Sequence, residues 1–144
     1  MQDQNSTILA AVQEYISKCP LLKSLDMHID QTEDEPVNYS LSSSGQILLN
    51  IDILGNETWQ YNVLLQSREY TADDYARLDN AAFTEQFIFY LQSCNKDGLY
   101  PALPDKCTAK EIYADNGILL YLDDNGDRGL YQIQIHLIFE REVF

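Results

Sequence analysis

The sequence predicts an α+β fold, in which an antiparallel, mostly hairpin-built sheet carries two helices packed on one face. The segment 115–144 contains two apolar runs, 117–122 and 130–139, joined by a polar linker that includes Asn125-Gly126. The second run alternates apolar and polar side chains, and alternation beside an Asn-Gly turn is a strong hairpin signal. The apolar face of this closing hairpin needs a cover. The side chains expected on that face are Tyr131, Ile133, Ile135, Leu137 and Phe139.

A second hairpin is predicted earlier in the chain. Residues 46–54 are rich in isoleucine and leucine, and 58–66 alternate apolar side chains with amides. The polar segment 55–57 turns the chain between these two strands. We expect a further strand at 37–41, followed by a loop at 42–45, and a short strand at 111–114 ahead of the closing hairpin.

Two helices are predicted to cover the sheet. Apolar residues recur at helical spacing over 7–18, with Asn5 or Ser6 as the cap and Pro20 as the stop. The second helix follows Thr71, whose threonine-to-acid spacing is close to a capping box, and runs to about Ser93.

The second helix has more apolar surface than one sheet can cover. The stripe expected to face the sheet consists of Tyr75, Leu78, Ala82 and Phe89. The adjacent stripe consists of Phe83, Phe87 and Tyr90. A helix on one sheet needs about a third of its circumference to be apolar. The excess predicts a second buried contact, either with another subunit or with the first helix or the loop at 95–110.

Composition narrows the class of protein. A chain of 144 residues that is 45% hydrophobic predicts one globular domain over residues 1–144. The formal net charge of −14 disfavours binding to nucleic acid or to an anionic membrane. Ten tyrosines suit subunit contacts, and equally suit sheet edges. Since the start lacks signal-peptide features and the three cysteines lack CxxC spacing, we expect synthesis in the cytoplasm.

No catalytic, cofactor or metal motif is expected, and the chain is not predicted to be an enzyme. Asp123, Asn125 and Asp127 are spaced like the start of a calcium loop, but Gln134 stands where the bidentate glutamate should be. A solvated hairpin tip is the better interpretation. His28 and His136 are not at zinc spacing from any cysteine.

Several segments, in this order, resemble a family of small proteins encoded among the head–tail connection genes of tailed phages and prophages of Gram-positive bacteria. Members look like tail-terminator, or tail-completion, proteins, and some are labelled minor capsid protein. The resemblance spans nearly the whole chain through structural motifs. The segments are Tyr15 to Leu22, Ser67-Arg68-Glu69-Tyr70, Phe83-Thr84-Glu85-Gln86-Phe87, Leu99 to Pro104, Tyr121 to Asp127 and Tyr131-Gln132-Ile133-Gln134.

The resemblance implies a six-fold ring in the tail–neck region of a virion. Such a ring caps the tail tube, ends its polymerisation and presents a surface to the neck or connector protein. The expected partners are therefore copies of the chain itself, the tail-tube protein and the connector, with no nucleic acid and no membrane. The side chains expected at a subunit or tail interface are Arg68, Tyr70, Phe83, Phe87, Tyr90 and Tyr100.

Two other classes of function stay open at this stage. One is an acidic, monomeric binding module, such as an immunity protein or antitoxin, that blocks a basic partner. The other is a hydrolase with a dispersed active site, which would need a deep pocket holding a histidine with an aspartate or cysteine. The net charge would suit a basic tube end or connector if the chain is a tail terminator. It would suit a basic target if the chain is an inhibitor.

Overall fold

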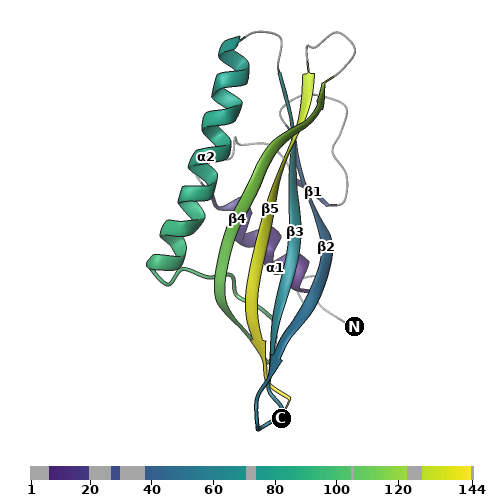
Figure 1. Ribbon diagram of the computed structural model, residues 1–144, viewed down its shortest axis with the longest axis vertical. Coiled ribbons are helices and arrows are strands. Elements are labelled where there is room, and N and C mark those ends of the chain that lie inside the picture. Colours follow the sequence, from purple (N-terminus) through teal and green to yellow (C-terminus); the bar gives the residue numbers. More distant parts are fainter. Residues whose placement is uncertain are drawn as a thin grey trace.

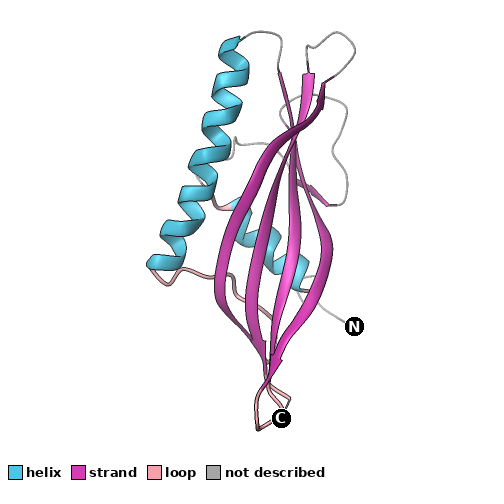
Figure 2. Cartoon of the chain, viewed as in Figure 1, coloured by secondary structure: helices cyan, strands magenta, loops and turns pink. Residues whose placement is uncertain are grey.

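One five-stranded sheet and two helices make up the described chain (Figure 1, Figure 2). The computed structural model describes residues 7–19, 27–29, 38–70, 74–104, 106–122 and 128–143. The strand order is β1-β2-β3-β5-β4; the four long strands are antiparallel and the short β1 joins β2 in parallel. The predicted α+β class is confirmed. The elements are α1 (Ile8–Ser17), β1 (Met27–Ile29), β2 (Asn38–Ile51), β3 (Glu57–Tyr70), α2 (Asp74–Lys96), β4 (Cys107–Leu122) and β5 (Arg128–Arg141).

The two predicted hairpins lie side by side and share one core. Their inner strands, β3 and β5, pair over their whole length, so that Val63 lies opposite Ile135 and Leu65 opposite Ile133. These alternating residues are buried, as their period of two predicts. Both helices pack on this same face, because buried side chains of each belong to the core cluster. The helix side chains in the cluster include Val12, Ile16, Phe87 and Leu91.

Two strands run through segments that the sequence predicts to be loops. The segment 42–45 lies inside β2, where the register with β3 shifts between Ser43 and Gly45. Gly45 has a φ of 110°, which only glycine adopts at low cost. Similarly, β4 continues through three register shifts instead of forming two short strands. Bulges accommodate these irregularities, since each extra residue bends a strand without ending it.

The first helix begins one or two residues later than expected. Thr7 is the cap, and its hydroxyl accepts a hydrogen bond from the Ala10 amide at 3.1 Å. The predicted caps Asn5 and Ser6 lie outside the described residues. So do the Thr71 cap and the acidic tip at 123–127.

The rotation of α2 differs from the prediction. Phe87 and Leu91 are fully buried, whereas Phe89 is 62% exposed. Residues two apart on a helix point about 200° away from one another, so burial of Phe87 turns Phe89 to solvent. Among the described side chains of α2, the stripe that faces the sheet is therefore Thr84, Phe87, Leu91 and Cys94; the side chains of Tyr75 and Leu78 lie outside the described part.

Within the chain itself, α1 covers part of the surplus apolar surface of α2. Tyr15 of α1 lies close enough to Cys94 of α2 for the thiol to contribute to the raised pKa of its hydroxyl. Tyr90 is partly buried against the core, and Cys94 contributes to its raised pKa as well. Phe83 stacks at 6.2 Å from Tyr39 and 6.0 Å from Phe87, measured between ring centroids. Phe83 and Phe87 are thus covered within the chain itself, by Tyr39 of β2 and by the core cluster.

Candidate assembly surface

The end of the β2–β3 hairpin is an exposed apolar surface. It projects beyond both helices, next to the C-terminus (Figure 1). Every residue from Ser43 to Leu54 is exposed. We call six aliphatic residues here the hairpin end; their exposed fractions run from 39% for Leu48 to 102% for Ile53. So many exposed aliphatic side chains within eight residues are unusual for the surface of a monomeric soluble protein. The hairpin end consists of Ile47, Leu48, Leu49, Ile51, Ile53 and Leu54.

Backbone hydrogen bonds hold the tip of this hairpin in one shape. The Asp52 carboxylate accepts hydrogen bonds from the amides of Leu54 and Asn56, each at 2.9 Å. The amide of Val143 donates to the Asn56 side chain at 3.3 Å, and Val143 itself is 41% exposed. Since the turn satisfies its own polar groups, it can hold Ile53 and Leu54 out in solvent.

The hairpin end carries little charge, although the chain as a whole is strongly acidic. Residues 42–51 contain no ionisable side chain. Directly after the turn, Glu57, which pairs with Ile51, accepts hydrogen bonds from Trp59 at 3.1 Å and from Arg141 at 2.9 Å. These two donors lower the pKa of Glu57, the Trp59 bond most. Glu57 is therefore paired within the fold, and Asp52, the acid that lies within the hairpin end, accepts hydrogen bonds from the amides of the turn.

An apolar hollow of about 280 Å³ adjoins the base of the hairpin. Trp59 and Phe139, which lie opposite each other on β3 and β5, form part of its wall. Leu48 of the hairpin end pairs with Trp59, so the hollow and the patch are continuous. Its other walls are Ile8, Gln46, Pro104, Cys107 and Arg141. Burial raises the pKa of the Cys107 thiol, which keeps that wall uncharged.

The two long edges of the sheet are protected to different degrees. On β4, the Ile112 amide donates to the Asn95 side chain of α2 at 2.7 Å, and three register shifts break the edge. On β2, the short β1 pairs only with residues 39–41. Among the described residues, no strand pairs with the outer edge of 42–51, and this segment contains neither lysine nor proline. Such an edge is a template for another strand.

The face of the sheet opposite the helices carries a polar network. His136 lies between Asn62 Oδ1 at 2.7 Å and Asp115 Oδ1 at 3.0 Å, and its ring stacks 4.9 Å from that of Tyr113. Gln60 donates to Asn62 at 2.9 Å. The imidazole bridges two oxygen acceptors, an arrangement that its protonated form satisfies on both sides. These groups are partnered to one another, which makes the network a structural feature of the open face.

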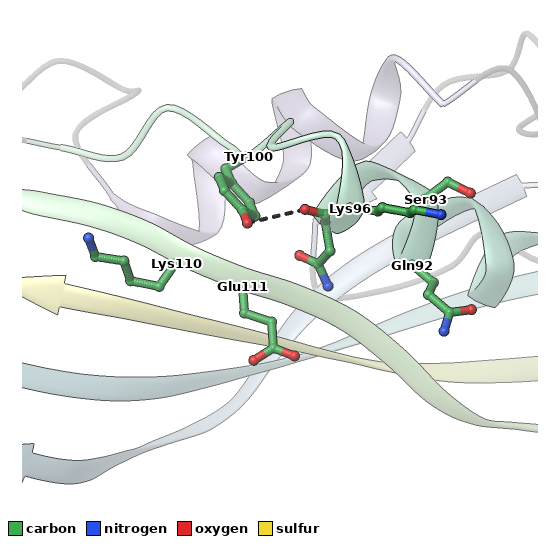
Figure 3. Close-up of a pocket in the computed structure, with 7 residues that line it drawn as sticks. Gln92, Ser93, Lys96, Tyr100, Lys110 and Glu111 are labelled. Atoms are coloured by element: carbon green, nitrogen blue, oxygen red, sulfur yellow. Dashed lines mark hydrogen bonds between the residues drawn. The ribbon is translucent and has the colours of Figure 1, made fainter.

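A pocket lies between the end of α2 and β4 (Figure 3). It has a volume of about 710 Å³ and polar walls. The Tyr100 hydroxyl donates to the Asn95 carbonyl at 3.3 Å across its rim. Its described lining does not hold the histidine with an aspartate or cysteine that we expect of a dispersed hydrolase site. The lining consists of Gln92, Ser93, Asn95, Lys96, Tyr100, Lys110 and Glu111.

The structure does not gather the sequence-predicted interface residues into one exposed patch. Phe87 is fully buried in the core, so its place on an interface is wrong for the folded chain. Phe83 and Tyr90 are partly buried against that core, and Tyr100 is 37% exposed beside the pocket. Arg68 and Tyr70 belong to β3, but their side chains lie outside the described part of the structure.

Sequence reasoning missed the hairpin end, although a signal was present. The strand 46–54 was expected to have one apolar face. Ile47, Leu48 and Leu49 are consecutive, however, and consecutive apolar residues on a strand point to both faces. A strand that is apolar on both faces needs a cover on both.

Comparison with known proteins leaves the surface itself as the guide to function. Neither a family model nor a curated protein sequence matches the chain. Among the described residues, no helix is long and apolar enough to cross a membrane. The same part of the chain holds no group of three or more His, Cys, Asp or Glu side chains that could bind a metal ion.

Proposed function

We propose that the protein is a structural subunit of a phage-tail-like particle, which forms a ring on the end of the tail tube. The ring ends polymerisation of the tube and offers its other surface to the head connector. The observation that carries the proposal is the hairpin end, an exposed apolar surface with little charge. The kind of particle is inferred from the sequence resemblance. The hairpin end provides a surface on which subunits could assemble.

The magnitude of apolar exposure suits a protein that functions in an assembly. Burying one isoleucine or leucine side chain completely contributes about 1.5–3 kcal/mol. The hairpin end exposes the equivalent of about three and a half such side chains, so its burial would contribute on the order of 5–11 kcal/mol before the entropic cost of association. A second contact is available at Phe89, the exposed aromatic residue on the outer side of α2. Ring closure requires two different surfaces per subunit.

The mechanism is binding without chemistry. Identical subunits, each joined to the next through two different surfaces, would close into a ring on the last layer of tube. The ring would cover the surface to which the next tube subunits add. The acidic character of the chain would draw it towards a basic tube end.

Polymerising tube protein provides the direct test. We expect the wild-type protein to stop elongation at substoichiometric amounts and to form six-fold rings at tube ends in electron micrographs. Ile53→Ser should abolish capping, because it removes the most exposed apolar side chain from the tip. Ile118→Ser, at a site 50% exposed on β4, is the matched control and should cap normally.

The same experiment addresses the alternative, an acidic inhibitor of a basic partner. That reading predicts a one-to-one complex and no effect on tube length. Tubes that grow at an unchanged rate, with no protein at their ends, would rule out the terminator. The search would then turn to a basic target.

A further inference from the structure

We infer that, in the free protein, the outer edge of β2 over residues 42–51 pairs antiparallel with the same edge of a second copy. The inference does not depend on the proposed function. It follows from the unprotected edge, from the charge pattern around it and from the protection of the opposite edge.

The edge has the features of a pairing surface. Its residues are exposed from Ser43 onward, and it offers backbone hydrogen bonds between and beyond its two register shifts. Natural sheets protect such edges with lysine, proline, bulges or a cover, and of these the described part of the segment has only its two register shifts. The two register shifts in β2 leave Gln46, Ile47 and Leu48 in regular register between them. A freely exposed edge with three consecutive aliphatic residues would aggregate unless something shields it.

Charge identifies the second copy as the occupant. Two chains of net charge −14 repel each other wherever acidic surfaces meet. Residues 42–51 are uncharged, so two copies of this edge can approach without placing like charges opposite one another. A basic partner, by contrast, would gain nothing from charge at this segment.

The protection of β4 selects which strand of the second copy takes part. Asn95 already occupies the Ile112 amide, and Lys110 and Glu111 stand on the same strand. The edge left free in the described part of the second copy is again β2. Pairing of β2 with β2 is isologous and stops at two subunits. A ring needs heterologous contacts, so the pair would shield the hairpin end before assembly and would open when a ring forms.

Light scattering and hydrogen exchange on the purified protein alone test this inference. We expect a mass twice the 16.6 kDa of one chain, with slow exchange at those amides of 42–51 that point away from β3. Ile47→Lys should raise the dissociation constant on the order of 100-fold, since each pair loses two isoleucines and gains two lysines. Leu49→Lys should act in the same direction. Ile118→Lys is the matched control, because Ile118 is 50% and Ile47 53% exposed.

Three results would overturn the inference. The first is a monomer at the highest soluble concentration, with fast exchange over 42–51. The second is a dimer in which these amides still exchange fast. The third is a dimer that Ile47→Lys and Leu49→Lys leave intact. Circular dichroism of each variant separates loss of pairing from loss of folding. A protein that does not cap tubes could still form the β2–β2 pair. The capping proposal and the pairing inference can therefore be disproved separately.

Discussion

At the scale of single residues, close approach between α2 and β4 depends on a glycine. A Cβ placed on Gly117 would lie 1.9 Å from Cγ2 of Thr84, a buried residue of α2. No side chain fits at this distance without displacing the helix. Gly117 is thus required by the helix that packs over it rather than by its own backbone conformation.

This contact gives a prediction with a built-in rescue. Gly117→Ala should lower the free energy of unfolding by about 1–3 kcal/mol, as overpacking does elsewhere. Thr84→Ser removes the methyl group that clashes, and the double variant should recover most of the loss. Urea unfolding measures all three proteins. If the double variant is no more stable than Gly117→Ala, steric conflict with Thr84 is not the cause.

A second set of residues makes stability depend on alkaline pH. Burial, followed by the bond with Cys94, raises the pKa of Tyr90 to about 12. Burial also raises the pKa of Tyr15, whose hydroxyl donates to the Leu99 carbonyl at 2.8 Å. A tyrosine in an unfolded chain titrates near pH 10. The stability that these hydroxyls contribute is therefore complete below about pH 10 and is lost as the pH rises through the folded-state values.

Urea midpoints between neutral pH and about pH 11 test this dependence. We expect a decline above pH 10 in the wild type and a shallower decline in a Tyr15→Phe, Tyr90→Phe double variant. An equal slope in both proteins would show that other groups cause the alkaline loss.

At the scale of elements, the two edges of the sheet determine where the protein can associate. The side chain of Asn95 ends the ladder at one edge by accepting the Ile112 amide. Because this acceptor comes from α2, the packing of α2 on the sheet also protects the β4 edge. The β2 edge has no such partner among the described residues, and its apolar residues continue into the hairpin end.

Asn95→Ala should show that protection of the β4 edge depends on α2. It leaves the Ile112 amide without its acceptor, at a cost of about 1–2 kcal/mol. Hydrogen exchange at Ile112 should become faster, while core amides of β5 keep their protection. Gln92→Ala, one turn earlier on the exposed side of α2, is the control and should change neither quantity. Unchanged exchange at Ile112 would mean that this amide is protected by another group.

At the scale of the whole molecule, the apolar end and the acidic remainder predict opposite responses to salt. If a basic tube end attracts the chain, its affinity for tube should fall steeply as salt is raised. Pairing of two acidic copies should instead be strengthened, because salt screens their mutual repulsion. Titrations over a range of sodium chloride concentrations measure both. A tube affinity that does not respond to salt would remove charge from the capping mechanism.

The sequence by itself determined the local periodicities. Alternation over 131–139 predicted the core side chains of β5 from Ile133 to Phe139, although Tyr131 at the start of the run is only partly buried, and helical spacing predicted both helices. These features follow from backbone geometry, which imposes a period of two on strands and 3.6 on helices. They required no knowledge of distant contacts.

Only the tertiary structure decided how these elements meet. Pairing of β3 with β5 joins two hairpins that are separated by α2, and the rotation of α2 buries Phe87 while exposing Phe89. Both depend on packing between segments far apart in the chain, which no local pattern encodes. The exposure of the hairpin end is likewise a result of where the helices stop. The surface available for assembly is thus a property of the fold, although its apolar residues stand consecutively in the sequence.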